Sequence, residues 1–136
     1  MTLGTPATVL AFDFGLRNIG VATGQAITRT ASEVTTLRAR DGVPNWNTID
    51  ALIQEWEPDV LLVGLPLNMD GTMSEMAKRA TRFARRLDAR YRIAVELIDE
   101  RLTSFEARGL SNDLDEQHAI AARLIAESFL RGLGKV

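Results

Sequence analysis

A continuous apolar run, Val60–Leu65, stands between Pro58 and Pro66 and sets the main limit on the architecture. A run of strand length without a polar side chain is typical of a β-strand covered on both faces, as in a parallel sheet. Apolar residues at helical spacing occur on both sides of it, at Ile49–Trp56 and again after Ser74. The sequence therefore predicts an α/β fold in which this strand lies inside the sheet.

The remaining segments predict how that sheet is completed. Strands are expected before the run at Thr8–Gly15, Asn18–Gly24 and Ile27–Leu37, and after it at Ile93–Ile98. Helices are expected between Pro44 and Pro58, from Ser74 to about Tyr91, as a short segment from Ser104, and from about Leu114 to Leu130. An antiparallel meander followed by right-handed crossovers is the order of the ribonuclease H-like fold, a mixed five-stranded sheet flanked by helices. In that fold the first strand and the apolar run are central neighbours.

Composition and length limit the class of protein. The chain has 136 residues, of which 46% are hydrophobic and 25% are charged, so we expect one globular domain over residues 1–136. It has no apolar stretch of transmembrane length and no legible secretory signal. It also lacks cysteine, which excludes disulfides and thiolate metal sites. We therefore expect a cytoplasmic protein without a membrane partner.

Charge is unevenly distributed, although the formal net charge is only -2. The segment from Lys78 to Arg92 contains many basic residues, and Asp88 is its only acidic residue. On a helical wheel the basic residues up to residue 90 lie opposite the apolar ones, so that one face of the helix is cationic. Lys78, Arg82 and Arg86 are therefore candidate contacts to a nucleic-acid backbone. A solvated helix face without a ligand explains the same pattern equally well.

An ionisable residue, Asp13, interrupts the apolar strand at Thr8–Gly15, between two phenylalanines. An unpaired buried carboxylate is costly, so this side chain should be neutralised, hydrogen-bonded or bound to a cation. The predicted topology places it near the carboxyl end of the last strand, where Asp99 and Glu100 follow. Converging carboxylates of this kind hold the divalent ions of phosphodiester hydrolysis. The alternative for Asp13 is a hydrogen bond to the turn that follows it.

Only one of Asp99 and Glu100 is expected to reach the same site as Asp13, because side chains alternate along a strand. An ion pair with Arg101, or a cap for the following helix, is the alternative role of either residue.

Three motifs together resemble those of the YqgF family. They are DFGLRNIG at residues 13–20, GLPLNMDG at residues 64–71 and DERLTS at residues 99–104. Members of this family are described as Holliday-junction resolvases or pre-16S ribosomal RNA nucleases, and their fold is ribonuclease H-like. The resemblance implies a nuclease that uses Mg²⁺ or Mn²⁺. It also favours Glu100 over Asp99 as the partner of Asp13.

The last helix departs from the family pattern. The family carries an aspartate three residues before a pair of alanines, and this chain has His118 before Ala121 and Ala122. His118 shares a helical stripe with Ala122 and is expected to face the sheet, and Asp115 lies one turn earlier on nearly the same side. Either residue could complete the metal site, and a histidine ligand would shift the preference toward manganese. A histidine without a metal role is the alternative.

Further contacts to nucleic acid are expected around the carboxylates. Arg17 lies close to Asp13 in the sequence, and Arg101 follows Glu100, so both arginines could contact a phosphate or pair with these same carboxylates. Asn68 lies in the loop after the apolar strand, where functional side chains are frequent.

The sequence thus predicts an endonuclease that hydrolyses phosphodiester bonds in structured nucleic acid. The resemblance alone places 5′-end maturation of precursor 16S ribosomal RNA ahead of cleavage of branched DNA. Its catalytic candidates are Asp13, Asp99, Glu100, Asp115 and His118, with Asp13, Glu100 and His118 as candidate metal ligands. A binding module of the same fold without catalysis is one alternative, and an actin-like kinase or ATPase is disfavoured because the chain has no room for a second lobe. Either a monomer or a homodimer is compatible with the sequence.

Overall fold

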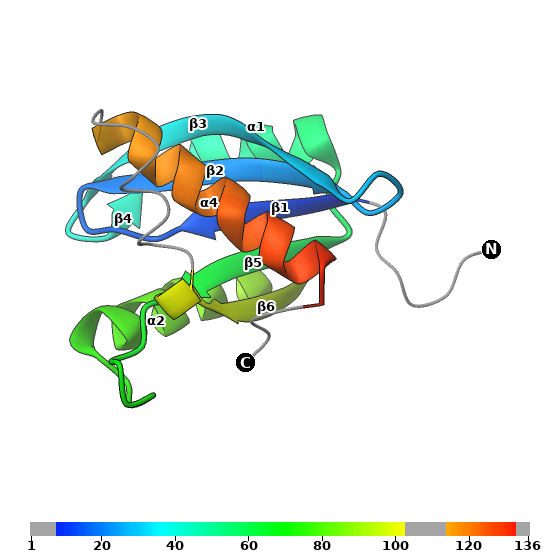
Figure 1. The fold of residues 1–136 in the computed structure, drawn as a ribbon. Helices are drawn as coiled ribbons and strands as arrows, with labels where there is room; N and C mark the ends of the chain where they lie inside the picture. The colour runs from blue at the N-terminus through cyan, green and yellow to red at the C-terminus, as the bar shows by residue number, and fades with distance from the viewer. Residues whose placement is uncertain (1–7, 103–113, 133–136) are drawn as a thin grey trace.

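Residues 8–102 and 114–132 are described by the computed structural model of the chain (Figure 1). Its strands are β1 Thr8–Asp13, β2 Asn18–Gln25, β3 Thr30–Arg40, β4 Val43–Pro44, β5 Val60–Leu65 and β6 Ala94–Asp99. Its helices are α1 Trp46–Trp56, α2 Glu75–Tyr91, the 3-10 turn η1 Glu100–Leu102 and α4 Leu114–Leu130. The short helix expected from Ser104 lies outside the described residues.

The strands form one mixed sheet in the order β4-β3-β2-β1-β5-β6. β1 pairs antiparallel with β2 on one side and parallel with β5 on the other, and β5 pairs parallel with β6. The predicted arrangement is therefore confirmed, with β1 and the apolar strand β5 as central neighbours. The sheet has a sixth strand where five were expected, because β4 adds two residues, Val43 and Pro44, beside the end of β3. A strand of that length leaves no periodic pattern in a sequence.

The third strand lies further along the chain than expected. It runs over Thr30–Arg40 instead of Ile27–Leu37. Ile27 belongs to the turn before it and is 92% exposed, and Arg29 ends that turn with a φ of 55°. The apolar character of Ile27 favours a strand, but the chain has to reverse direction at this point to pair β3 with β2.

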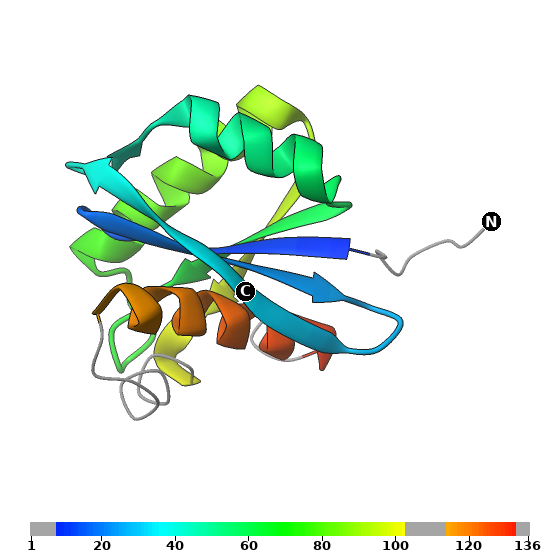
Figure 2. The ribbon, with the colours of Figure 1, turned by 90° about the horizontal axis from the view of Figure 1, so that it is seen from above.

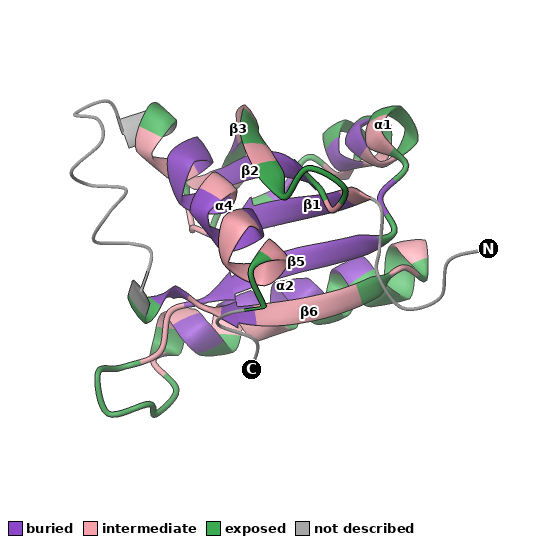
Figure 3. Cartoon of the chain, turned by 45° about the vertical axis from the view of Figure 1, so that its right-hand side comes forward, coloured by how far each residue is buried: buried purple, intermediate pink, exposed green. Residues whose placement is uncertain are grey.

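Different helices cover the two faces of the sheet (Figures 1 and 2). α1 and α2 pack on one face and α4 packs on the other. Along β1, Leu10 and Phe12 lie in the same cluster as Phe83 of α2, whereas Val9 and Ala11 lie with residues of α4. The central strands β1 and β5 are accordingly buried on both faces, as the apolar run predicts (Figure 3).

α2 begins where the sequence predicts. Oγ of Ser74 accepts a hydrogen bond from the N–H of Ala77 at 2.9 Å and so caps the first turn. The buried side of the helix includes Ala80, Phe83 and Leu87, and the arginines lie outside this buried side, with Arg79 half-buried and Arg82 and Arg86 exposed. No helix in the two described ranges is long and apolar enough to cross a membrane.

Gly20 of β2 allows α4 to approach the sheet closely. This residue pairs with Asp13 across the β1–β2 ladder. A Cβ atom on Gly20 would lie 1.9 Å from the carbonyl oxygen of His118, a separation that real Cβ atoms essentially never show. The backbone of α4 therefore rests directly on β2 at His118.

Gly20→Ala is expected to lower the free energy of unfolding by roughly 1–3 kcal/mol, because the added methyl group would push the α4 backbone away from β2. Urea unfolding followed by circular dichroism measures the change. Ser32→Ala, at an exposed position of β3, is the control and should stay within about 0.5 kcal/mol of the parent. An unchanged unfolding midpoint for Gly20→Ala would contradict the close approach of α4.

Candidate active site

Asp13 and Glu100 reach the same face of the sheet because side chains alternate along strands. β1 ends at Asp13, earlier than expected, and this side chain follows Val9 and Ala11 on the α4 face. Glu100 is the first residue of η1, and its carboxyl group lies over Gly64 next to Ile125 of the cluster on that face, so it points there too. β1 and β6 flank β5, and the two acids therefore meet across the carboxyl end of β5.

Gly64 of β5 leaves the space that the Glu100 side chain fills. A Cβ atom on Gly64 would lie 2.6 Å from Cδ of Glu100 and 2.6 Å from Cδ1 of Ile125. Glu100 is only 6% exposed, so its carboxyl group is buried over β5. The glycine at the start of the second motif therefore determines where this carboxyl group can lie.

The two carboxyl groups contact each other and a histidine. The side chains of Asp13 and Glu100 are in hydrogen-bonding contact with each other, and a shared proton or a bound cation would stabilise this contact. Nδ1 of His118 lies 3.0 Å from Oδ2 of Asp13. His118 therefore faces the sheet, as the helical stripe predicts, and α4 contributes to the same cluster as β1 and η1.

Burial raises the pKa of both carboxyl groups. For Asp13 the loss of hydration is the dominant cause, and the hydrogen bond with Glu100 acts in the opposite direction. For Glu100 burial again contributes most, and the hydrogen bond and the charge of Asp13 raise its pKa further, against a lowering by His118. The pair therefore binds a proton more readily than two exposed carboxylates would, and a cation bound between them would take the place of that proton.

The chemistry of these donors fits a hydrated hard cation. Two buried carboxyl groups side by side offer oxygen ligands and, once ionised, excess negative charge, which Mg²⁺ and Mn²⁺ prefer. Within residues 8–102 and 114–132, no group of three or more His, Asp or Glu side chains is arranged as a complete metal site. Asp13 and Glu100 therefore fit an ion that keeps several water ligands. The side chain of Asp115, the other candidate of α4, is not among the described ones.

Asp99 belongs to a different set of contacts. Leu97, two residues earlier in β6, packs in the cluster on the α2 face. Asp99 forms an ion pair with Arg101. Oδ2 of Asp99 accepts a hydrogen bond from Nη2 of Arg101 at 2.6 Å, and Oδ1 accepts one from the main-chain N–H of Arg101 at 2.9 Å. The guanidinium group lowers the pKa of Asp99. Of the two adjacent acids, the structure thus brings Glu100 to Asp13.

Arg101 and Asn68 both hold the loop after β5. Nη1 of Arg101 donates to the carbonyl oxygen of Met69 at 3.2 Å, and Nδ2 of Asn68 donates to Oγ1 of Thr72 at 2.9 Å. Both side chains therefore stabilise the loop at the carboxyl end of β5. Arg17 is the exposed residue of the connection between β1 and β2, and its side chain forms no ion pair within the described part of the chain.

The candidates on α2 lie apart from the carboxylates. Nζ of Lys78 is 3.4 Å from Oε1 of Glu75, whereas Arg82 and Arg86 are exposed and form no ion pair among the described residues. α2 covers the face of the sheet opposite to the one that carries Asp13. The structure therefore does not bring these three residues into the carboxylate cluster.

Gly20 and Gly64 are positioning residues that the sequence analysis missed. A signal for both was present, since a glycine inside a strand marks a bulge or the close approach of another group. Which group approaches is decided by how α4 and η1 pack on the sheet. That information is absent from the local pattern around either glycine.

The sheet has the strand order of the ribonuclease H-like class, and the buried carboxylate pair at the carboxyl ends of β1 and β6 suits the divalent ions of phosphodiester hydrolysis. A sequence model of the family described as "RuvX: Holliday junction resolvase" matches residues 7–132. A Saccharophagus degradans protein named "Putative pre-16S rRNA nuclease" is 50% identical over 135 residues, which cover 93% of this chain and 95% of the relative. A Pseudomonas fluorescens protein of the same name is 51% identical over 131 residues, which cover 90% of each. The chain belongs to the RuvX family, the YqgF family that its motifs resemble.

Solved structures of low sequence identity share the fold. RuvC of T. thermophilus, in complex with a Holliday junction substrate, matches with a TM-score of 0.56 at 10% identity, over 92% of this chain and 94% of that one. The yeast mitochondrial Holliday junction resolvase Ydc2 matches with a TM-score of 0.53 at 10% identity, over 90% of this chain and 77% of that one. These matches confirm the ribonuclease H-like class predicted from the order of elements.

Glu100→Gln is expected to raise the unfolding free energy of the metal-free protein at neutral pH by an amount on the order of 1 kcal/mol. The pKa of Glu100 is raised above 4.5 in the folded state, so folding retains a proton that the unfolded chain loses. The parent is therefore destabilised as the pH rises from about 4.5 through the raised pKa of Glu100, and glutamine removes this loss.

Urea unfolding in a chelator between pH 4 and pH 8 measures this effect, where ~1 kcal/mol is resolvable. The difference between parent and variant should be small at the acidic end and largest at the basic end. Glu75→Gln, at a side chain that is 87% exposed, is the matched control and should show no such trend. A stability difference independent of pH would contradict the raised pKa of Glu100.

Proposed function

We propose that this nuclease is a divalent-metal-dependent endonuclease and that its substrate is the 5′ end of precursor 16S ribosomal RNA. The observation that carries the proposal is the buried, mutually hydrogen-bonded pair of Asp13 and Glu100 at the carboxyl ends of β1 and β6. Burying two acids side by side lowers the stability of the fold, and a cation bound between them would offset this cost. The substrate is supported by the names of relatives that are 50% and 51% identical.

Asp13 and Glu100 would hold Mg²⁺ or Mn²⁺, with Asp115 or His118 as a further protein ligand. When bound, such an ion supplies Lewis acidity to a phosphate oxygen and lowers the pKa of water. The contact between Nδ1 of His118 and Asp13 orients the aspartate, whichever role the rest of the imidazole has. Asp99 acts indirectly, because it fixes the guanidinium group of Arg101.

Three side chains around the carboxylates would contact the substrate. Arg17 lies in the exposed turn just after Asp13, and a guanidinium group there suits a phosphate. Arg101 and Asn68 hold the loop after β5 beside the site, and their polar groups would contact the substrate there. We place the whole activity in one domain, residues 1–136, acting in the cytoplasm as a monomer or a homodimer.

A branched DNA substrate is the second candidate, and the description of the family favours it. Resolution of a junction needs two symmetric cuts and hence a two-fold dimer, whereas trimming of an RNA end does not. Parallel assays on a four-way DNA junction and on an RNA that spans the precursor 5′ end separate the two substrates.

Asp13→Asn and Glu100→Gln are each expected to lower the single-turnover cleavage rate on the precursor RNA by about 100-fold or more with Mn²⁺ present, because each removes a carboxylate from the cation site. Asp88→Asn, at an exposed position of α2, is the matched control and should cleave like the parent. If the parent binds the RNA and Asp13→Asn changes no measurable cleavage rate, the chain is a binding module and the proposal fails.

His118→Asp is expected to shift the ratio of the Mn²⁺-supported to the Mg²⁺-supported cleavage rate toward Mg²⁺, if the imidazole is a ligand. His118→Asn is the companion variant, because its amide can still donate a hydrogen bond to Asp13. Rates with each cation are measured for the parent and both variants. An unchanged ratio in His118→Asp, with near-parent rates in His118→Asn, would show that His118 only positions Asp13.

A further inference from the structure

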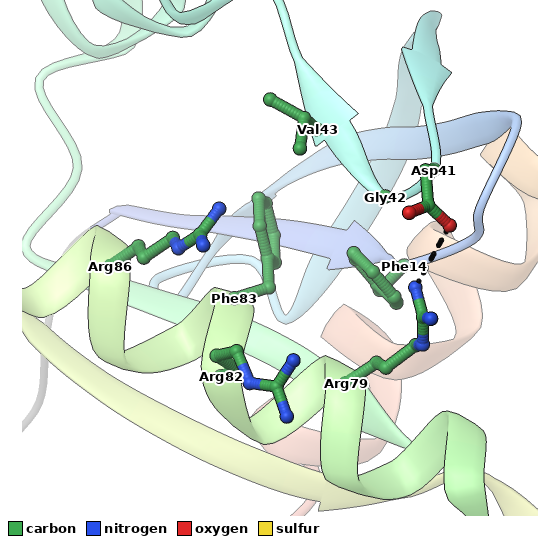
Figure 4. A pocket seen from close by; sticks show the side chains of 8 residues that line it. All are labelled: Phe14, Asp41, Gly42, Val43, Arg79, Arg82, Phe83 and Arg86. Carbon is green, nitrogen blue, oxygen red and sulfur yellow. Dashed lines mark hydrogen bonds and ion pairs between the residues drawn. The ribbon is translucent and has the colours of Figure 1, made fainter.

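A pocket of about 210 Å³ lies on the face of the sheet opposite to the carboxylates, between α2 and the turn that joins β3 to β4 (Figure 4). Arg79, Arg82 and Arg86 of α2 line one side of it, and Asp41, Gly42 and Val43 line the other. The bottom is formed by the rings of Phe14 and Phe83, which are buried and lie 5.2 Å apart between centroids. Arginines at its rim and an aromatic base make this pocket suited to an anion that carries a flat apolar group.

The arginines of the pocket differ in how far they are neutralised. Nη1 of Arg79 is bound to Oδ1 of Asp41 at 3.1 Å. Arg82 and Arg86 are exposed and have no ion pair within residues 8–102 and 114–132. Asp41 is the only acidic residue of the lining, so the pocket as a whole carries net positive charge.

A second hollow lies next to this pocket along α2. Arg86 also lines a space of about 420 Å³ together with Trp46, Ala89 and Arg90. The guanidinium group of Arg90 lies over the ring of Trp46 at 5.4 Å from its centroid and is bound to Asp50. Arg86 lines both hollows, and we call the two hollows together the α2 groove; Arg82 and Arg86 are its cations without an ion pair among the described residues.

The α2 groove starts beside the candidate active site. Phe14 lines the groove and directly follows Asp13, whose side chain lies on the opposite face. A strand held at the carboxylates would have to pass this edge of the sheet to enter the groove. Successive arginines on one helix face are about 5–6 Å apart at Cβ, a spacing that suits neighbouring phosphates of an extended strand.

We propose that the α2 groove binds a single-stranded stretch of the RNA substrate that flanks the cleaved bond, with its phosphates on Arg82 and Arg86. This inference rests on the proposed function. RNA fits better than an acidic protein segment, because the half-buried ring of Trp46 borders the cations and offers apolar surface to a base. Asp41 weakens the site, since it occupies Arg79 and adds a negative charge to the lining.

The test uses a fluorescent precursor RNA with a single-stranded extension, and binding is followed by anisotropy in a chelator so that no cleavage is needed. Arg82→Ala/Arg86→Ala should weaken binding by about tenfold and reduce the slope of log K against log salt by about 1.4, since a single strand contributes roughly 0.7 per phosphate contact. Arg85→Ala is the matched control, because Arg85 is exposed on the same helix and lines neither hollow. Its effects should be clearly smaller.

Asp41→Asn gives an effect of the opposite sign. It frees Arg79 and removes the negative charge, so RNA binding should tighten by severalfold. Asparagine tolerates the positive φ of 50° at this position, so the turn should be kept. RNA binding that is unchanged or weaker in Asp41→Asn would overturn the proposal.

Three further results would overturn the proposal, and a fourth would refute only the proposed function. The proposal is overturned if the double variant binds RNA no more weakly than Arg85→Ala, or if it loses equal affinity for a blunt duplex without an extension. It is also overturned if the variant loses affinity for polyglutamate and none for RNA, since the occupant is then an acidic protein. Retained binding without any cleavage by the parent would refute the proposed function and leave the RNA groove standing.

Discussion

The contact between two buried carboxyl groups, Asp13 and Glu100, is the interaction on which the rest of the structure depends. Burial raises the pKa of each acid, and Asp13 raises the pKa of Glu100 further, whereas the hydrogen bond with Glu100 lowers the pKa of Asp13. Such a pair is retained only if the surrounding fold forces it together. Here the force comes from hydrophobic packing of α4 on one face of the sheet and from the parallel pairing of β5 with both β1 and β6.

Two glycines make that packing possible without any chemistry of their own. Gly64 leaves the volume in which the Glu100 side chain lies, and Gly20 allows the α4 backbone to reach β2 and bring His118 to Asp13.

The carboxyl end of β1 contributes residues to two different sites. Asp13 faces α4 and the carboxylate cluster, whereas Phe14 faces the arginines of α2. One strand end therefore serves a site for chemistry on one face and a cationic groove on the other.

Local sequence patterns predicted an element correctly where one clear signal was present, such as an unbroken apolar run or a helix cap. The apolar run at Val60–Leu65 predicted the central strand with its observed bounds, and Ser74 predicted the start of α2. The third strand was misplaced because the apolar Ile27 lies in an exposed turn. β4 was missed because two residues carry no period. The alternation of side chains predicted that only one of Asp99 and Glu100 reaches Asp13, and the family resemblance favoured Glu100. The structure shows Glu100 beside Asp13.

The sequence by itself determined the class of fold, the strand that lies in its centre and the small set of acids that could meet there, because burial and alternation act over a few neighbouring residues. The tertiary structure decided which acids meet, which arginine is already paired, and which helix face lines a groove. Those relations join residues far apart in the chain, such as Asp13 with His118 and Asp41 with Arg79. They depend on the packing of helices against both faces of one sheet, which no local pattern encodes.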